Sequence, residues 1–271
     1  MSFSRLAEAI AACRSPLCVG IDPHPDRLGT EPDAALRFGR AVIRASTGRV
    51  AAVKPQFAFF EALGWQGMRA LATICVEARD AGLIVIADAK RGDIGTTAAA
   101  YAAATLAADA PFPADVLTVS PFLGLDTLAP FVAVAREHDR SVYVLTRTSN
   151  PGSATFQDAA EAPLCEWLQA HVDVAGAVVG ATHAAAVSRL RGALPGTAFL
   201  LPGYGTQGGS AASTRAAFSG AGARSTLVVS ARGATLPAPA DPDLALWLDD
   251  PSTWMAGRID ALNADLAGLS P

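Results

Sequence analysis

Several features that would assign this sequence to a particular class are missing or scarce. No apolar run approaches the roughly 18 residues that a membrane span needs, and segment 1–15 resembles a short amphipathic helix without the core of a signal peptide. We therefore expect a cytoplasmic location and no membrane partner. A net charge of −4 argues against the broad basic surface that nucleic acid requires, which leaves a small molecule as the expected ligand.

Cysteine is also scarce, and the chain shows no pattern typical of a metal site. The four cysteines lie far apart, with no C-x-x-C pair, so neither a disulfide framework nor a zinc site is predicted. The four histidines are scattered, and Asp88 and Asp93 alternate with cations that would repel a divalent ion. We expect reduced thiols and no metal ion.

Short apolar runs alternate along the chain with longer, alanine-rich helical segments. The strand candidates are 17–21, 51–53, 83–87, 116–119, 142–145, 177–179, 198–201 and 227–229. The helix candidates are 34–45, 61–79, 96–107, 125–137, 162–171, 184–191, 211–218 and 253–266. This alternation predicts a parallel sheet, and eight units without a dividing linker favour an α/β fold of the single (β/α)8 TIM-barrel type over a doubly wound sheet. We expect one domain over residues 1–271.

Lysine is nearly absent, because the chain has 19 arginines but only two lysines, Lys54 and Lys90. Both follow predicted strands, where a barrel enzyme carries its chemistry, and a lysine can release a proton that arginine keeps. Side chains alternate along a strand, so Asp88 and Lys90 are predicted to point together into the barrel while Ala89 points outward. Because a buried ion pair adds little net stability, this pair is a candidate for function.

A second gap spans residues 174–240, which contain no Asp or Glu. The five arginines in this span are Arg189, Arg191, Arg215, Arg224 and Arg232. We interpret Arg189, Arg191 and Arg215 as residues of helix surfaces, whereas Arg232 directly follows the eighth strand. The preceding loop, "PGYGTQGG" (202–209), offers glycine backbone N–H groups of the kind that bind phosphate. The segment therefore predicts an anionic phosphate ligand.

The same loop contains a G-x-G-x-x-G pattern formed by Gly203, Gly205 and Gly208. In a dinucleotide-binding fold this pattern opens the first βαβ unit, and an acidic residue for the ribose follows about 20 residues later. The acid-free span provides no such residue. We therefore do not predict dinucleotide binding.

Six motifs in order resemble the longer bacterial branch of the orotidine 5'-phosphate decarboxylase family. Asp88 to Ile94 matches the family signature D-x-K-x-x-D-[IV]. The six motifs are "LCVGIDPHP" (17–25), "AVKPQFAFFE" (52–61), "ADAKRGDIGTTAAAYA" (87–102), "SPFLG" (120–124), "TSNPG" (148–152) and "PGYGTQGG" (202–209). The resemblance implies a (β/α)8 barrel, a homodimer with active sites at the interface, and cofactor-free conversion of orotidine 5'-monophosphate to uridine 5'-monophosphate.

The resemblance also implies a role for individual residues. Lys90 would donate a proton to C6 of the pyrimidine, beside Asp88 and Lys54. Asp93, Ile94 and Thr97 would reach into the partner subunit's site. The residues implied to contact substrate in their own subunit are Asp22 at the ribose, Ser149 at the pyrimidine, Gln207 between phosphate and base, Arg232 at the phosphate, and Gly203 and Gly205 in the phosphate loop. Arg91 matches no family role, and strand alternation predicts a solvent-facing or interface side chain. Tyr204 receives no role.

Two alternatives remain open from the sequence. One is a phosphosugar enzyme of the same superfamily, a 3-keto-gulonate-phosphate decarboxylase or hexulose-phosphate synthase, which shares a related signature but uses Mg²⁺. The other is a barrel that binds a ligand without catalysis, for which the loss of at least one charged site residue would be expected. None of the implied charged residues is missing here.

Overall fold

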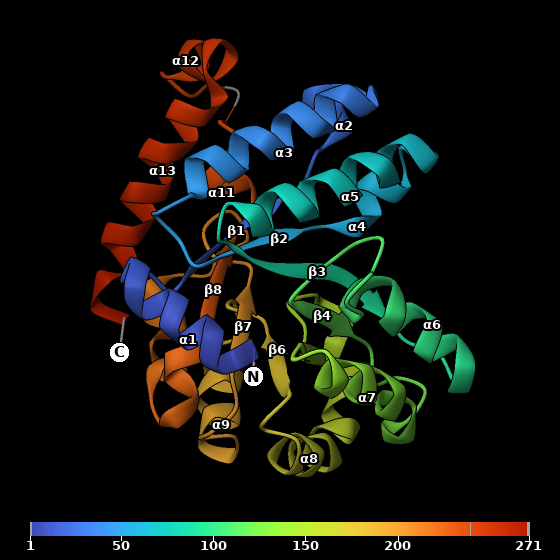
Figure 1. The fold of residues 1–271 in the computed structure, drawn as a ribbon. Helices are drawn as coiled ribbons and strands as arrows, with labels where there is room; N and C mark the ends of the chain where they lie inside the picture. The colour runs from blue at the N-terminus through green and yellow to red at the C-terminus, as the bar shows by residue number, and fades with distance from the viewer. Residues whose placement is uncertain (1, 239, 270–271) are drawn as a thin grey trace.

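Eight parallel strands close into a barrel in the computed structural model, which describes residues 2–238 and 240–269 (Figure 1). The strands pair in chain order, and β8 closes the ring against β1. They are β1 Leu17–Ile21, β2 Ala52–Pro55, β3 Ile84–Arg91, β4 Val116–Val119, β5 Ser141–Arg147, β6 Ala175–Val179, β7 Phe199–Pro202 and β8 Leu227–Ser230. The predicted (β/α)8 barrel is confirmed, and each predicted strand overlaps one of these.

Helices surround the barrel on its outer side, except α1, which packs against the barrel interior (Figure 1). They are α1 Ser2–Cys13, α2 Pro25–Leu28, α3 Pro32–Ser46, α4 Phe57–Glu61, α5 Gly64–Asp80, α6 Gly95–Leu106, α7 Ala129–Glu137, α8 Ala154–Ala170, α9 Ala184–Ala193, α10 Ala211–Thr214, α11 Arg232–Thr235, α12 Leu244–Asp249 and α13 Pro251–Leu266. No helix in the described part of the chain is long and apolar enough to cross a membrane.

Some predicted helices differ from the observed ones. The helix predicted over 61–79 begins at Gly64, because the chain turns between Glu61 and Gly64, where Gly64 adopts a φ of +68°. The short helix α4 before this turn was not predicted. Helix α8 begins at Ala154, eight residues before its predicted start, and includes Pro163. The segment predicted as a helix over 211–218 consists of one α-helical turn followed by a 3-10 turn.

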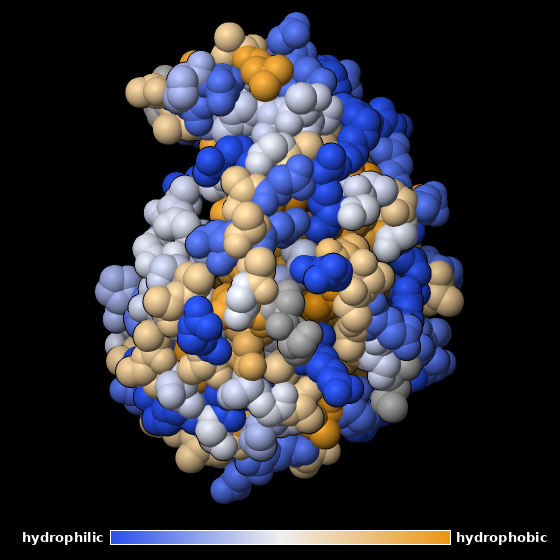
Figure 2. Space-filling view, turned by 90° about the vertical axis from the view of Figure 1, so that its left-hand side faces the viewer, coloured by the Kyte–Doolittle hydropathy of each residue, from blue (hydrophilic) through white to orange (hydrophobic). Residues whose placement is uncertain are grey.

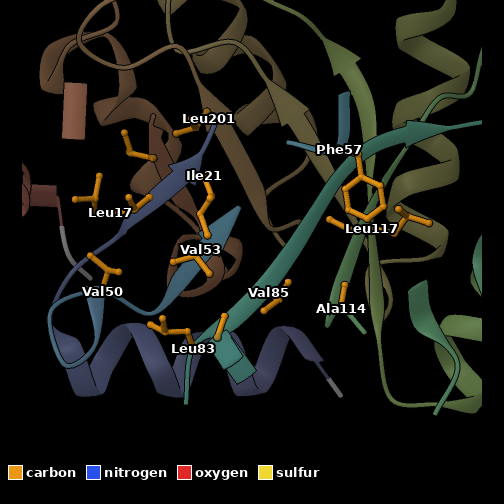
Figure 3. Packing of buried hydrophobic residues seen from close by; sticks show 14 of the residues in the cluster. Leu17, Ile21, Val50, Val53, Phe57, Leu83, Val85, Ala114, Leu117 and Leu201 are labelled. Carbon is orange, nitrogen blue, oxygen red and sulfur yellow. The ribbon is translucent and has the colours of Figure 1, made fainter. Parts of the chain in front are cut away.

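Side-chain alternation divides the buried apolar residues into two layers. Val53, Val85 and Leu117 belong to the layer between strands and helices, part of which Figure 3 shows. The barrel interior is a separate cluster that includes Ile86 and Tyr143. Toward the C-terminal ends of the strands, the inward-facing side chains change from apolar to polar. The barrel interior opens there into a cavity.

The N-terminal helix α1 contributes to the interior cluster. Its Phe3, Leu6 and Ile10 are buried with the inward-facing residues of the strands, and the ring of Phe3 meets that of Tyr143 edge to face at 5.3 Å. A Cβ on Gly176 would lie 2.6 Å from the Tyr143 ring, so this tyrosine requires glycine on the neighbouring strand. The N-terminal end of the barrel is thus filled with side chains, and the opposite end carries the cavity.

The C-terminal helices α12 and α13 lie on the face that Figure 2 views, where hydrophilic and hydrophobic residues are mixed. Helix α13 packs against α3 and α11, and Asp250 caps its N-terminus by accepting hydrogen bonds from the backbone N–H groups of Ser252 and Thr253. Trp247 of α12 is buried and donates a hydrogen bond from its ring nitrogen to the carbonyl oxygen of Thr235. Both helices are thereby fastened to the barrel.

The predicted surface location of Arg191 is wrong. We predicted a surface residue, but its side chain is buried: its guanidinium donates to the carbonyl oxygens of Leu194 and Thr197 at 2.8 Å each. It also lies 3.8 Å from the ring centre of Phe199. Burial lowers the pKa of Arg191 to about 10. Sequence spacing could not show this, because the acceptors come from a loop that folds back onto α9.

Replacing Arg191 with alanine is expected to lower the free energy of unfolding by roughly 2–4 kcal/mol, since two buried carbonyl groups lose their donor. The matched control is Arg189→Ala on the same helix, where an exposed arginine pairs with Glu161; a loss of about 0.5 kcal/mol or less is expected there. Urea unfolding of both variants measures the difference. Equal losses would contradict a structural role for Arg191.

Candidate functional site

A cavity opens at the C-terminal ends of the strands, where the predicted site residues converge. Eight of the twelve predicted residues line it, namely Asp22, Lys54, Asp88, Lys90, Ser149, Gly203, Gln207 and Arg232. Its floor is formed by inward-facing side chains of the last layer of the barrel, including Leu145, Val178 and Leu200. The half of the cavity beside the ends of β1 to β3 is therefore charged, whereas apolar side chains of β5 to β7 form the floor.

Asp88 lies at the centre of the charged half, between the two lysines of the chain. One carboxylate oxygen, Oδ2, accepts a hydrogen bond from Nζ of Lys54 at 2.5 Å, and the other, Oδ1, accepts one from Nζ of Lys90 at 2.5 Å. Gln56 and Thr118 donate to the same carboxylate at 2.9 and 3.2 Å. The predicted ion pair between Asp88 and Lys90 is confirmed, and Ala89 packs outward against the helix layer.

Burial and charge act in opposite directions on these groups. Burial alone would raise the pKa of Asp88, but the ammonium groups of Lys54 and Lys90 outweigh it and hold that pKa well below its usual range. Burial would likewise lower the pKa of Lys54, yet the carboxylates of Asp88 and Asp22 raise it. Asp88 and Lys54 are thus held in their ionised forms. The Lys54 side chain is 5% exposed whereas that of Lys90 is 46% exposed, so of the two only Lys90 is open to a ligand.

Asp22 follows β1 and faces the same cavity. Its Oδ1 atom is buried and has no hydrogen-bond partner within the described chain, and burial raises the pKa of this carboxyl. A buried oxygen without a donor is costly unless a ligand supplies one. Asp22 is therefore suited to accept a hydrogen bond from a hydroxyl group of a bound molecule.

The loop after β7 forms the opposite wall of the cavity. Gly203 and Gly205 have φ values of +100° and +78°, which glycine adopts without strain, and the backbone N–H of Gly209 closes the loop on the carbonyl oxygen of Gly203 at 3.0 Å. Gln207, from this loop, lies within 3.4 Å of the Ser149 hydroxyl. Arg232 begins α11 and lines the same wall, so a guanidinium and glycine-rich backbone lie together as phosphate binding requires.

Tyr204, which received no role from the sequence, anchors this loop to α13. It is buried, and its hydroxyl donates a hydrogen bond to a carboxylate oxygen of Asp265 near the end of α13. Burial and that carboxylate raise the pKa of Tyr204. The partner is 61 residues away in sequence, so no local pattern could have indicated it.

Four predicted site residues do not line this cavity. Gly205 lies outside it, and so do Asp93, Ile94 and Thr97, which stand at the start of α6. Oδ1 of Asp93 accepts a hydrogen bond from the backbone N–H of Ile94 at 2.7 Å, and the Ile94 side chain is 64% exposed. Within one chain, the signature D-x-K-x-x-D is therefore split between the cavity and the surface.

Sequence reasoning missed several residues of the cavity. Thr118 on β4 donates to Asp88 and also accepts a hydrogen bond from the backbone N–H of Lys90 at 2.9 Å. Thr118 could have been predicted, because it is a polar residue near the C-terminal end of the predicted strand 116–119. Gln56 was noticeable only as a polar residue after β2. No group of three or more His, Cys, Asp or Glu side chains that could hold a metal ion occurs among residues 2–238 and 240–269.

Comparison with known proteins gives a consistent result. The model of the family described as "Orotidine 5'-phosphate decarboxylase / HUMPS family" matches residues 15–241. The orotidine 5'-phosphate decarboxylase of Deinococcus radiodurans is 42% identical over 262 residues, covering 89% of this chain and 93% of the relative. That of Rhodopirellula baltica is 40% identical over 256 residues, covering 82% and 85%. The structure of Leishmania donovani OMP decarboxylase is similar with a TM-score of 0.76, at 33% identity, covering 98% of this chain and 99% of that one.

Proposed function

Because the chain belongs to the orotidine 5'-phosphate decarboxylase / HUMPS family, we propose that it converts orotidine 5'-monophosphate to uridine 5'-monophosphate and CO2 in pyrimidine biosynthesis. The observation that carries the proposal is the array in which Lys54 and Lys90 both bind Asp88 in the cavity. The proposal includes a cytoplasmic location and one functional domain over residues 1–271.

The chemical difficulty of this reaction lies in the electron pair left at C6 of the pyrimidine when the bond to the carboxylate breaks. That pair has little resonance stabilisation in the ring, so a positive charge beside C6 is needed. Lys90 supplies this charge, held in place by Asp88, and its fixed position costs no reorganisation as the negative charge develops. CO2 leaves, and a proton from Nζ of Lys90 forms the new C6–H bond. Lysine then regains a proton from solvent.

In this proposal Asp88 faces the substrate carboxylate, and its negative charge disfavours the bound substrate relative to the transition state. It keeps its charge because Lys54, a buried residue in the wall of the cavity, pairs with its second oxygen. Lys54 thus stabilises the array electrostatically, whereas Lys90 acts on the substrate. Gln56 and Thr118 orient the same carboxylate through their hydrogen bonds.

The remaining cavity residues bind the rest of the nucleotide. Asp22 accepts a hydrogen bond from a ribose hydroxyl, which satisfies its buried oxygen. Ser149 contacts the pyrimidine, and Gln207 bridges base and phosphate. Arg232 and the backbone N–H groups around Gly203 and Gly205 bind the phosphate. Binding energy from the phosphate fixes the ring over Lys90, so a remote group contributes to the reaction.

A homodimer completes the site in this proposal. Asp93, Ile94 and Thr97 of one subunit enter the cavity of the other, Asp93 extending the charge network and Ile94 lining the pyrimidine pocket. Exposed apolar side chains support an interface near the cavity: Phe122 and Phe156 are 70% and 64% exposed and meet edge to face at 5.5 Å. They line a second cavity that shares Leu145 with the first.

Mixing inactive chains tests this arrangement. Lys90→Ala and Asp93→Ala homodimers are each expected to be inactive or strongly impaired, whereas a refolded mixture should regain activity, because one site of each mixed dimer carries both Lys90 and the partner's intact carboxylate. Steady-state turnover of the mixture against each parent measures this. Activity no higher than the mean of the two parents would show that Asp93 serves its own subunit or none.

The Mg²⁺-dependent phosphosugar enzymes remain the alternative within the family description. A carboxylate that binds two ammonium groups is poorly available to a divalent cation, which favours orotidine monophosphate over a phosphosugar. The test is to incubate the purified protein with orotidine 5'-monophosphate, and separately with 3-keto-gulonate 6-phosphate and Mg²⁺, and to measure CO2 and identify the product. Release of CO2 only from the sugar phosphate would overturn the proposal. Tight binding of uridine monophosphate without CO2 release would indicate a non-catalytic barrel.

A further inference from the structure

The backbone at Lys90 has an unusual conformation. Its φ is +48°, in the left-handed region that costs energy for any residue with a Cβ atom. The pairing of β3 with β4 also shifts register between Ala87 and Arg91, so the strand departs from regular geometry at this point. Such a conformation persists only where its surroundings hold it in place.

The inner side of this turn is held by the site itself. The backbone N–H of Lys90 donates to Thr118 at 2.9 Å, and Nζ of Lys90 donates to Asp88 at 2.5 Å. Beyond the turn, the carbonyl oxygen of Arg91 accepts a hydrogen bond from the backbone N–H of Ser120 at 2.7 Å. The backbone N–H of Lys90 and the carbonyl group of Arg91 are thus both held by residues at the end of β4.

The outer side is held by the side chain of Arg91. Its guanidinium forms an ion pair with Glu61 at the end of α4, and its central carbon lies 5.8 Å from the ring centre of Phe57 and 5.3 Å from that of Tyr101 on α6. Only 26% of the Arg91 side chain is exposed. Of the two expectations for Arg91, the solvent-facing side chain is therefore wrong, because Arg91 joins α4 and α6 across the end of β3. The interface side chain stays a prediction.

We propose that Arg91 is a positioning residue for Lys90: by fixing the outer side of the strained turn, it holds the lysine ammonium at the place where the reaction needs it. This role rests on the proposed decarboxylase function. Arg91 and Lys90 are adjacent, so the peptide between them cannot rotate without moving either the guanidinium from its two rings or the ammonium from Asp88. The same contacts fix the start of the segment that carries Asp93.

The test compares Arg91→Ala, Arg91→Lys and Glu61→Gln with the unmodified protein, using orotidine 5'-monophosphate as substrate. Arg91→Ala is expected to lower kcat about tenfold or more while KM changes by about twofold or less, since a misplaced catalytic group slows chemistry more than binding. Arg91→Lys, which lacks the planar fork, should recover part of the loss. Millimolar methylguanidinium should raise kcat of Arg91→Ala, because it can occupy the vacated place between the rings.

The matched control is Arg40→Ala, which removes another arginine–glutamate pair between two helices, with Glu77 at 2.6 Å and outside the cavity. It should leave kcat unchanged and show no response to methylguanidinium. If Arg91→Ala behaves as the control does, the positioning role is refuted while the proposed function stands. If the unmodified protein releases no CO2, the proposed function is refuted and this role with it. Should Arg91→Ala fail to fold, an unchanged kcat in Glu61→Gln would refute the role instead.

Discussion

Replacing Lys90 with alanine is expected to abolish measurable turnover of orotidine 5'-monophosphate, with kcat falling by at least about 10³-fold, because the change removes both the proton donor and the positive charge beside C6. Affinity for uridine 5'-monophosphate should be largely retained, since Gln207, Arg232 and Asp22, the proposed phosphate and ribose contacts, lie elsewhere in the cavity. Single-turnover kinetics and equilibrium binding of the product measure the two effects separately.

Lys90→Arg is the matched variant for that experiment. It keeps a positive charge near Asp88 but holds its proton too tightly to donate it, so turnover should remain far below normal. Binding should again be retained. Near-normal turnover of either variant would remove Lys90 from the proton-donor role. Loss of product binding together with turnover would point instead to a collapsed cavity.

Replacing Asp88 with asparagine is expected to have the second largest effect, on both activity and stability. Lys54 is buried and would lose its counterion, and breaking a buried ion pair from one side typically costs about 3–5 kcal/mol. Turnover should fall as well, because Lys90 loses the carboxylate that holds its ammonium. Urea unfolding and kcat measure the two losses.

The control is Asp260→Asn, an exposed carboxylate that pairs with Arg49 on the surface. It should change neither quantity appreciably, because exposed ion pairs contribute little. Equal stability of Asp88→Asn and the unmodified protein would mean that the array is not the tightly coupled group described above.

The pH dependence of the Asp88 effect has a definite sign. The pKa of Asp88 is lower in the folded chain than its unfolded value of about 3.9, so the folded state binds the proton less readily. The stability that this carboxylate provides is therefore fully present above about pH 4 and is lost as the pH falls through the lower folded pKa. The difference in unfolding free energy between the unmodified protein and Asp88→Asn should shrink as the pH falls below about 4.

Most of the fold followed from the sequence because its signals are local. Alternation of apolar runs with helical segments determined the number and order of the strands, and side-chain alternation correctly placed Asp88 and Lys90 together inside the barrel. The turn before Gly64 was missed, and the helix was predicted to begin three residues too early, because Glu61, Ala62 and Leu63 all favour helix. The exact ends of helices depend on tertiary contacts, whereas the order of the elements follows from local sequence patterns.

The parts of the site that the sequence could not give depend on contacts between distant segments. Arg191 was placed on the surface because helical spacing carries no information about the carbonyl groups of a following loop. Arg91 and Tyr204 were left without roles because their partners, Glu61 and Asp265, lie on helices far from them in sequence. Each of these residues has a charged or polar group whose partner becomes apparent only when the barrel is assembled.

In the proposed reaction, Lys90, Asp88 and Lys54 decarboxylate orotidine 5'-monophosphate without a metal ion. This is tested by measuring CO2 release from this substrate by the purified protein in excess EDTA, and again after Mg²⁺ is added in excess of the chelator. We predict full activity in EDTA, formation of uridine 5'-monophosphate, and no increase on adding Mg²⁺. Loss of activity in EDTA with recovery in Mg²⁺ would refute a metal-independent reaction.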